Sequence, residues 1–178
     1  MLYPIGIQNF EKLREGGYVY VDKTSLIHKL ATSGTYYFLS RPRRFGKSLL
    51  ISTMEAYFKG KKELFRGLAL EKLEKDWTEY PVLHLDLNSG RYMIPGDLDV
   101  VLDQHLNNWE ARYGVNRKYD DCSARMNDII DAACDKTGRQ VVILIDEYDK
   151  PIVNNLGNEE LTDYYRKTCI SSYRRNLG

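Results

Sequence analysis

The residues best suited to bind phosphate lie in one basic loop, Ser40-Arg41-Pro42-Arg43-Arg44-Phe45-Gly46-Lys47-Ser48. A glycine lets the backbone approach a phosphate, a lysine ammonium pairs with the terminal phosphates, and a serine hydroxyl is a ligand for Mg²⁺. Backbone N–H groups that enter a helix complete such a cradle. The predicted phosphate-binding residues are Arg43, Arg44, Phe45, Gly46, Lys47 and Ser48. The alternative is a basic surface turn before a helix.

A second candidate group follows the apolar run 141–145, where Asp146 and Glu147 come in succession. A carboxylate at the end of a buried strand suits a metal ion, and a neighbouring carboxylate can activate a water molecule. The alternative is an ordinary polar end to an apolar strand. With the phosphate loop upstream, the pattern predicts hydrolysis of a nucleoside triphosphate. Lys47 and Glu147 are then the predicted catalytic residues, and Ser48 and Asp146 the predicted metal ligands.

Elements on both sides of the loop must position it. The aromatic and apolar run Tyr36–Ser40 predicts a buried strand of a parallel sheet, and the apolar spacing in 49–58 predicts a helix that stops near Gly60. Arg41 stands where the general phosphate-loop pattern has its first glycine. Pro42 restricts Arg41 to extended geometry and removes one N–H from the cradle.

These segments resemble the bacterial AAA-ATPase-like family, which comprises predicted P-loop ATPases. The resemblance extends from residue 1 to about residue 168. It implies that ATP and Mg²⁺ are the ligands, and that the lack of the first glycine is usual for the family. Fuller members carry a C-terminal domain that resembles PD-(D/E)XK nucleases. The segments that carry the resemblance are 6–15, 20–24, 36–50, 80–86 and 145–151.

Helical and extended patterns alternate along the chain, which predicts an α/β fold: a P-loop NTPase core with a parallel sheet flanked by helices. Residues 1–34 are predicted to form an N-terminal helix–strand–helix extension packed on the core of residues 35–178. The predicted helices of the extension are Asn9–Glu15 and Asp22–Leu30, around a strand at Tyr18–Val21. The predicted core strands are Tyr36–Ser40, Val82–Leu87 and Val141–Ile145, and the later helices run from Asp97 to Gly114, from Cys122 to Gly138 and from Glu159 onward.

A P-loop ATPase with a catalytic glutamate has a further strand between the loop strand and the acidic strand. No segment of the sequence matches it, so we expect that strand to lie beyond Gly178 and the core to be truncated before its last strands. A core without this strand exposes apolar strand edges. The 178 residues alone are therefore expected to associate and to hydrolyse ATP poorly.

The segment before the first core strand often closes over the nucleotide base in P-loop ATPases. Gln8, Phe10 and the stretch Tyr20–Lys23 are candidates for such a wall. The equally acceptable alternative is ordinary packing within the N-terminal part of the chain.

Composition limits the partners. Lysine and arginine number 26 against 25 acidic residues, so net charge does not support nucleic acid as a ligand. The longest apolar run is too short for a membrane helix. The three cysteines lack C-x-x-C spacing, which predicts free thiols in a cytoplasmic protein. Beyond ATP, a protein partner or self-association is expected.

Three functions are compatible with these motifs. The first is binding of ATP with Mg²⁺-dependent hydrolysis in the complete protein. The second is a nucleotide-gated interaction module with little turnover. The third is the ATPase part of a nuclease-linked, nucleic-acid-processing protein.

Overall fold

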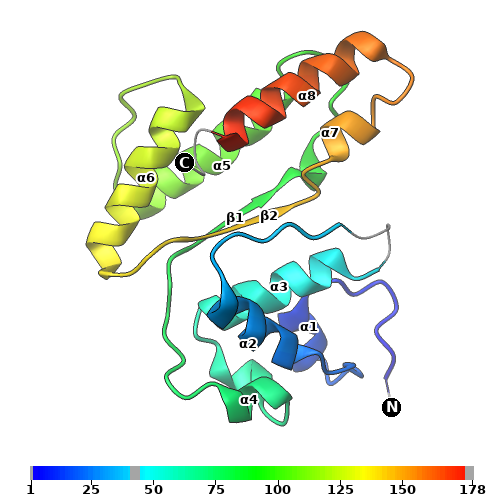
Figure 1. The fold of residues 1–178 in the computed structure, drawn as a ribbon, viewed down its shortest axis with the longest axis vertical. Coiled ribbons are helices and arrows are strands. Elements are labelled where there is room, and N and C mark those ends of the chain that lie inside the picture. The colour runs from blue at the N-terminus through cyan, green and yellow to red at the C-terminus, as the bar shows by residue number, and fades with distance from the viewer. Residues whose placement is uncertain (1, 41–44, 175–178) are drawn as a thin grey trace. The chain divides into compact units, whose positions relative to one another are not determined.

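The computed structural model describes residues 2–40 and 45–174, with side chains as far as residue 167. The chain divides into two compact units, Met1–Val82 (unit 1) and Leu83–Gly178 (unit 2) (Figure 1). The predicted division into an extension of residues 1–34 and a core of residues 35–178 stays a prediction.

Unit 1 is built from short helices around an aromatic core. Phe10 and Phe65 are fully buried with ring centroids 4.9 Å apart, and Leu70 is buried beside them. α1 packs against α3, and α2 packs against α4. The helices of unit 1 are α1 (Phe10–Glu15), α2 (Thr24–Ser33), α3 (Lys47–Phe58), η1 (Lys62–Phe65) and α4 (Ala69–Leu73).

Local capping fixes where the first helix begins. The Asn9 side chain accepts a hydrogen bond from the backbone N–H of Lys12 at 2.9 Å, as an N-cap residue does. The predicted helix is therefore confirmed with its start moved by one residue.

The predicted strands of unit 1 are wrong. Tyr36–Ser40 adopts no strand, and its large side chains are exposed instead of buried. The predicted strand Tyr18–Val21 is reduced to one isolated parallel bridge between Tyr18 and Leu2. Because the described part of unit 1 offers only that bridge, the apolar segment has no strand there with which to form a ladder. The exposed fractions are 69% for Tyr36, 51% for Tyr37, 72% for Phe38 and 39% for Leu39.

Unit 2 is an α/β arrangement around two parallel strands. Leu83, Leu85 and Leu87 alternate along and just after the first strand and are all buried in the core, together with helix residues such as Ile129 and Tyr165. Figure 1 shows α5, α6 and α8 on the same side of the strand pair. The elements of unit 2, the first of them starting at the unit boundary, are β1 (Val82–Asp86), η2 (Leu87–Ser89), α5 (Asp97–Tyr113), α6 (Cys122–Thr137), β2 (Val142–Asp146), α7 (Lys150–Val153) and α8 (Glu159–Arg174).

The long helices of unit 2 end where the sequence predicts. Gly114 and Gly138 adopt left-handed conformations, with φ of 75° and 63°, directly after α5 and α6. The Asp121 carboxylate caps the start of α6 by accepting the N–H of Ala124 at 2.9 Å. The short helix α7 was not predicted, because Pro151 follows its first residue and reads in sequence as a break.

A buried ionic network joins α5 to α6. The Arg125 guanidinium is almost fully buried and donates to both carboxylate oxygens of Glu110, at 2.7 and 2.9 Å. It also donates to Asn107 at 2.7 Å and to Asp103 at 2.5 Å. The hydrogen bond from Arg125 lowers the pKa of the Asp103 carboxyl and so favours the charged form of that group.

We expect Arg125→Met to destabilise the protein by about 3–5 kcal/mol, because it leaves the carboxylate of Glu110 buried without its counter-charge. Urea unfolding measures this loss. The matched control is Arg166→Met, which removes an exposed arginine paired with exposed Asp163 and should cost less than about 1 kcal/mol. Equal losses in the two variants would contradict the assignment of the network as a core interaction.

Candidate nucleotide site

The chain enters α3 through a glycine with a left-handed backbone. Gly46 adopts a left-handed conformation with φ 74° and ψ 27°, and the helix begins at the next residue. A Cβ at Gly46 would meet no atom within 4 Å, so glycine is needed there for its backbone conformation rather than for space. Among the residues that the structure describes, no side chain caps this helix start. The first-turn N–H groups have no acceptor within the helix, which is the condition under which helix starts can bind anions.

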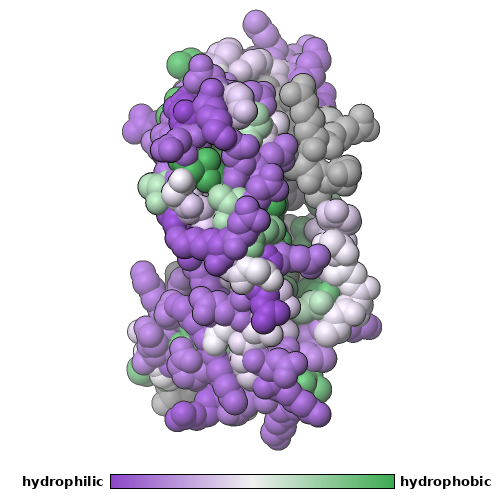
Figure 2. Space-filling view, turned by 90° about the vertical axis from the view of Figure 1, so that its left-hand side faces the viewer, coloured by the Kyte–Doolittle hydropathy of each residue, from purple (hydrophilic) through white to green (hydrophobic). Residues whose placement is uncertain are grey.

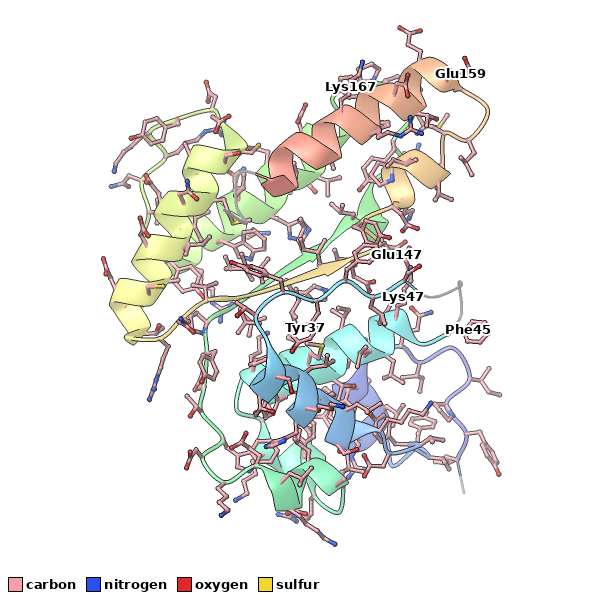
Figure 3. The ribbon with its side chains drawn as sticks, viewed as in Figure 1. Tyr37, Phe45, Lys47, Glu147, Glu159 and Lys167 are labelled. Atoms are coloured by element: carbon pink, nitrogen blue, oxygen red, sulfur yellow. The ribbon has the colours of Figure 1, made fainter. Side chains whose placement is uncertain are left out.

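The predicted phosphate-binding residues fall into two sets. Phe45, Gly46, Lys47 and Ser48 lie consecutively at the start of α3, where Figure 3 shows the Phe45 and Lys47 side chains. Phe45 is 65% exposed, whereas Lys47 and Ser48 are half-buried. Arg43 and Arg44 lie outside the described residues.

Hydrogen bonds hold α3 to the N-terminal segment of unit 1. The Ser52 hydroxyl accepts the backbone N–H of Phe10 at 2.9 Å and contacts the carbonyl of Gln8 at 3.2 Å. The Lys61 ammonium pairs with Glu11 at 2.6 Å. The helix that begins with Lys47 is therefore fixed through its second turn and through the segment that follows it.

Three of the residues considered for a base-contacting wall make structural contacts within unit 1. Phe10 is fully buried in the core, and Tyr20 packs edge-on against it at a centroid distance of 5.2 Å. Asp22 joins the starts of α2 and α4, because its carboxylate accepts the N–H of Thr24 at 2.8 Å and the N–H of Ala69 at 2.7 Å. Phe10 and Asp22 therefore take part in contacts within unit 1, as the alternative to a base-contacting wall predicts.

The Asp22 carboxylate gives a pH-dependent contribution to stability. Burial opposes its charge, but the hydrogen bonds from Thr24 and Ala69 outweigh burial and lower the pKa from its ordinary value of 3.8. A carboxyl group with a lowered folded-state pKa stabilises the fold fully above its unfolded-state pKa. That stability disappears as pH falls through the lower folded-state value.

We therefore expect Asp22→Ala to cost about 1 kcal/mol at pH 7, the usual effect of losing a capping carboxylate. The difference from wild type should shrink as pH falls from about 4 to below the folded-state pKa. Denaturant unfolding at pH 7, 4 and 2.5 measures it, with Asp76→Ala as an exposed aspartate outside this network. A difference that stays constant over this range would show that the charge of Asp22 is irrelevant.

In unit 2, the predicted acidic residues lie at the carboxyl end of β2. Asp146 is the last residue of the strand and only 7% exposed, and Glu147 follows it half-buried (Figure 3). One Asp146 oxygen accepts the backbone N–H of Glu147 at 2.9 Å. Glu147 has a positive φ of 54°, which is rare for a residue with a side chain.

The end of β1 adds residues that sequence analysis missed. Asp86 ends this strand and accepts the N–H of Asn88 at 2.8 Å. The Lys150 ammonium, from the segment after β2, donates to the side-chain oxygen of Asn88 at 2.6 Å and to its carbonyl oxygen. These residues could have been found from their place directly after a predicted strand, because the carboxyl ends of parallel strands meet at one edge of a sheet.

The donor chemistry fits Mg²⁺. Among the described residues, no three His, Cys, Asp or Glu side chains gather closely enough to hold a metal ion. Mg²⁺ in nucleotide sites is bound through one or two protein oxygens, with phosphates and water supplying the rest. A serine hydroxyl at Ser48 and a buried carboxylate at Asp146 are hard oxygen donors of that kind.

The predicted site residues thus occupy two places. Gly46, Lys47 and Ser48 begin α3 in unit 1, while Asp146 and Glu147 follow one another at the end of β2 in unit 2.

Comparison with known proteins identifies the class. A family model described as "Predicted AAA-ATPase" matches residues 4–176. The chain therefore belongs to the AAA-ATPase-like family, which confirms the family inferred from the sequence motifs. The nuclease-like domain of fuller members stays a prediction.

A similar protein comes from Azotobacter chroococcum mcd 1, where it is named "Uncharacterized protein in vnfD 5'region". It is 43% identical over 172 residues, which are 96% of this chain and 33% of the relative. The chain thus spans about a third of the length of that relative. No solved structure matches the chain.

In the described parts of the chain, no helix has both the length and the apolar character that a membrane span needs. On the face shown in Figure 2, hydrophilic residues predominate and hydrophobic residues are scattered in small groups.

Proposed function

We propose that the chain binds ATP with Mg²⁺ and that the complete protein hydrolyses it. The observation that carries this proposal is the start of α3, where left-handed Gly46 leads into a helix that opens with Lys47 and Ser48. Family membership supports nucleotide binding independently of that geometry.

Each residue of the phosphate loop has a distinct part. The N–H groups of the first helical turn and the positive end of the helix dipole attract the phosphates. The Lys47 ammonium neutralises charge on the terminal phosphates. Ser48 and Asp146 supply oxygen ligands to Mg²⁺, which when bound offsets the negative charge that develops on the phosphates.

Glu147 is the residue that accepts a proton from the attacking water. Asp146 is buried, and one of its oxygens is already engaged by the Glu147 N–H. Glu147 is less buried, and its side chain is one methylene longer. The two neighbouring carboxylates therefore take different roles, with Asp146 toward the metal and Glu147 toward the water.

We expect Lys47→Ala to weaken ATP binding by about 2–3 kcal/mol, because it removes a charge-assisted contact. That corresponds to roughly a 30- to 140-fold rise in Kd. Calorimetry on the full-length protein measures it. The matched control is Lys59→Ala, which removes a lysine just after the other end of α3, paired there with Glu55. Equal affinity in wild type and Lys47→Ala would refute the proposed site.

We expect Glu147→Gln in the full-length protein to keep ATP affinity while kcat falls about 100-fold or more, the effect of losing a general base. Asp146→Ala should instead weaken the Mg²⁺-dependent part of ATP binding. Steady-state hydrolysis and calorimetry with and without Mg²⁺ separate the two variants. Normal turnover by Glu147→Gln would assign the acidic pair to metal binding or structure. Tight ATP binding without turnover in wild type would favour the nucleotide-gated interaction module.

A further inference from the structure

The turn after β2 holds Glu147 in a strained backbone conformation. A φ of 54° places a residue with a Cβ in the left-handed region, which costs energy unless surrounding contacts enforce it. The backbone N–H and the carbonyl of Glu147 both form hydrogen bonds with residues close in sequence. Its N–H donates to Asp146 Oδ1 at 2.9 Å, and its carbonyl accepts the N–H of Lys150 at 3.0 Å.

The side chain of Lys150 ties this turn to the end of the neighbouring strand. Its ammonium donates to Asn88 Oδ1 at 2.6 Å and also to the Asn88 carbonyl oxygen. Lys150 thus makes two kinds of contact: its backbone N–H binds the Glu147 carbonyl, and its ammonium binds Asn88 in η2. We call this pair of contacts the Lys150–Asn88 anchor.

The two segments that the anchor joins are otherwise well fixed. The Asn155 side-chain amide, itself buried, donates to the carbonyls of Tyr92 and Pro151 at 2.7 and 2.8 Å. The fully buried Tyr92 donates its hydroxyl to the Leu87 carbonyl at 2.7 Å. A Cβ at Gly90 would lie 2.3 Å from the Tyr92 ring, so the chain passes tightly around that ring. The anchor therefore works between rigid supports.

We propose that Lys150 is a positioning residue that holds Glu147 in its left-handed conformation through the anchor to Asn88. This inference rests on the proposed function, in which Glu147 accepts the proton of the attacking water. Without the anchor, the turn can relax toward negative φ, which re-aims the Glu147 side chain without removing it. Such a change should act on the chemical step and leave ATP binding nearly intact.

The anchor is better suited to geometry than to stability. Lys150 is half-buried, and the hydrogen bonds of its ammonium to Asn88 lie at an exposed position. The net contribution of these hydrogen bonds to stability is small, because the strain that they maintain at Glu147 offsets part of it and water replaces them when they break. Because the Lys150 ammonium is held by two oxygens of Asn88, the anchor mainly restricts the backbone of the turn that carries Lys150.

The kinetic test uses the full-length protein. Lys150→Met should lower kcat about 10- to 100-fold while the KM for ATP changes less than about twofold. Lys150→Arg and Asn88→Asp keep a charged or polar contact and should retain most of kcat. The matched control is Lys136→Met, since Lys136 also donates to a backbone carbonyl of unit 2, that of Arg112 at 3.1 Å. Wild-type kcat in Lys150→Met would overturn the inference.

A second test does not depend on activity. Glycine adopts positive φ without strain, so Glu147→Gly removes the strain that the anchor maintains. In wild type, loss of the anchor lets Glu147 relax, and this relief of strain offsets part of the lost stability. In the Glu147→Gly background there is no strain to relieve, so Lys150→Met should lower the free energy of unfolding more there than in wild type. Equal losses in the two backgrounds would show that the anchor and the conformation of Glu147 are independent.

The outcomes separate this inference from the proposed function. If Glu147→Gln turns over ATP normally, the role of Glu147 fails, and the unfolding cycle still decides whether Lys150 holds its conformation. If Glu147→Gln is inactive and Lys150→Met is fully active, the proposed function stands and the positioning role of Lys150 is refuted.

Discussion

The need to satisfy backbone N–H groups at the ends of helices and strands governs the whole candidate site. At α1 and α6 the side chains of Asn9 and Asp121 accept these groups. At α3 the chain enters through left-handed Gly46 instead, and no described side chain caps the first-turn N–H groups, which in the proposed function bind an anion. After β2 the side chain of Asp146 accepts the next N–H and so bends the chain at Glu147. Different solutions to one constraint thus shape the backbone at the proposed phosphate-binding residues and at the proposed acidic pair.

The constraint has an energetic consequence in unit 2. A left-handed non-glycine residue costs of order 1–3 kcal/mol, which the surrounding fold must offset. The stabilising interactions lie elsewhere in the unit, in the apolar residues of β1 and in the buried pairing of Arg125 with Glu110. Burial of both charges makes that pairing costly to break but weak as a net source of stability. The apolar core therefore carries most of the free energy, and the network fixes how α5 and α6 pack.

The sequence predicts the elements whose signals are local. Gly114 and Gly138 end α5 and α6 because a left-handed cap needs only the residue itself. The run Tyr36–Ser40 is apolar enough for a strand, but a strand also requires a partner, and no local pattern reveals one. Gly46, Lys47 and Asp146 are recognisable as a motif, whereas the contact between Lys150 and Asn88 joins residues 62 apart in sequence and follows only from the pairing of β1 with β2.

In unit 2, different residues contribute to the stability of the fold and to the proposed chemistry. Residues that bury charge or apolar surface, such as Arg125 and Leu85, act on the folded population as a whole. Lys150 is half-buried and Asn88 is exposed, and in the proposed anchor they act on the direction of the Glu147 side chain. Because an error in direction of about 1 Å can slow a reaction 100-fold while hardly changing stability, substitutions in these turns should be the ones that leave a well-folded protein with impaired turnover.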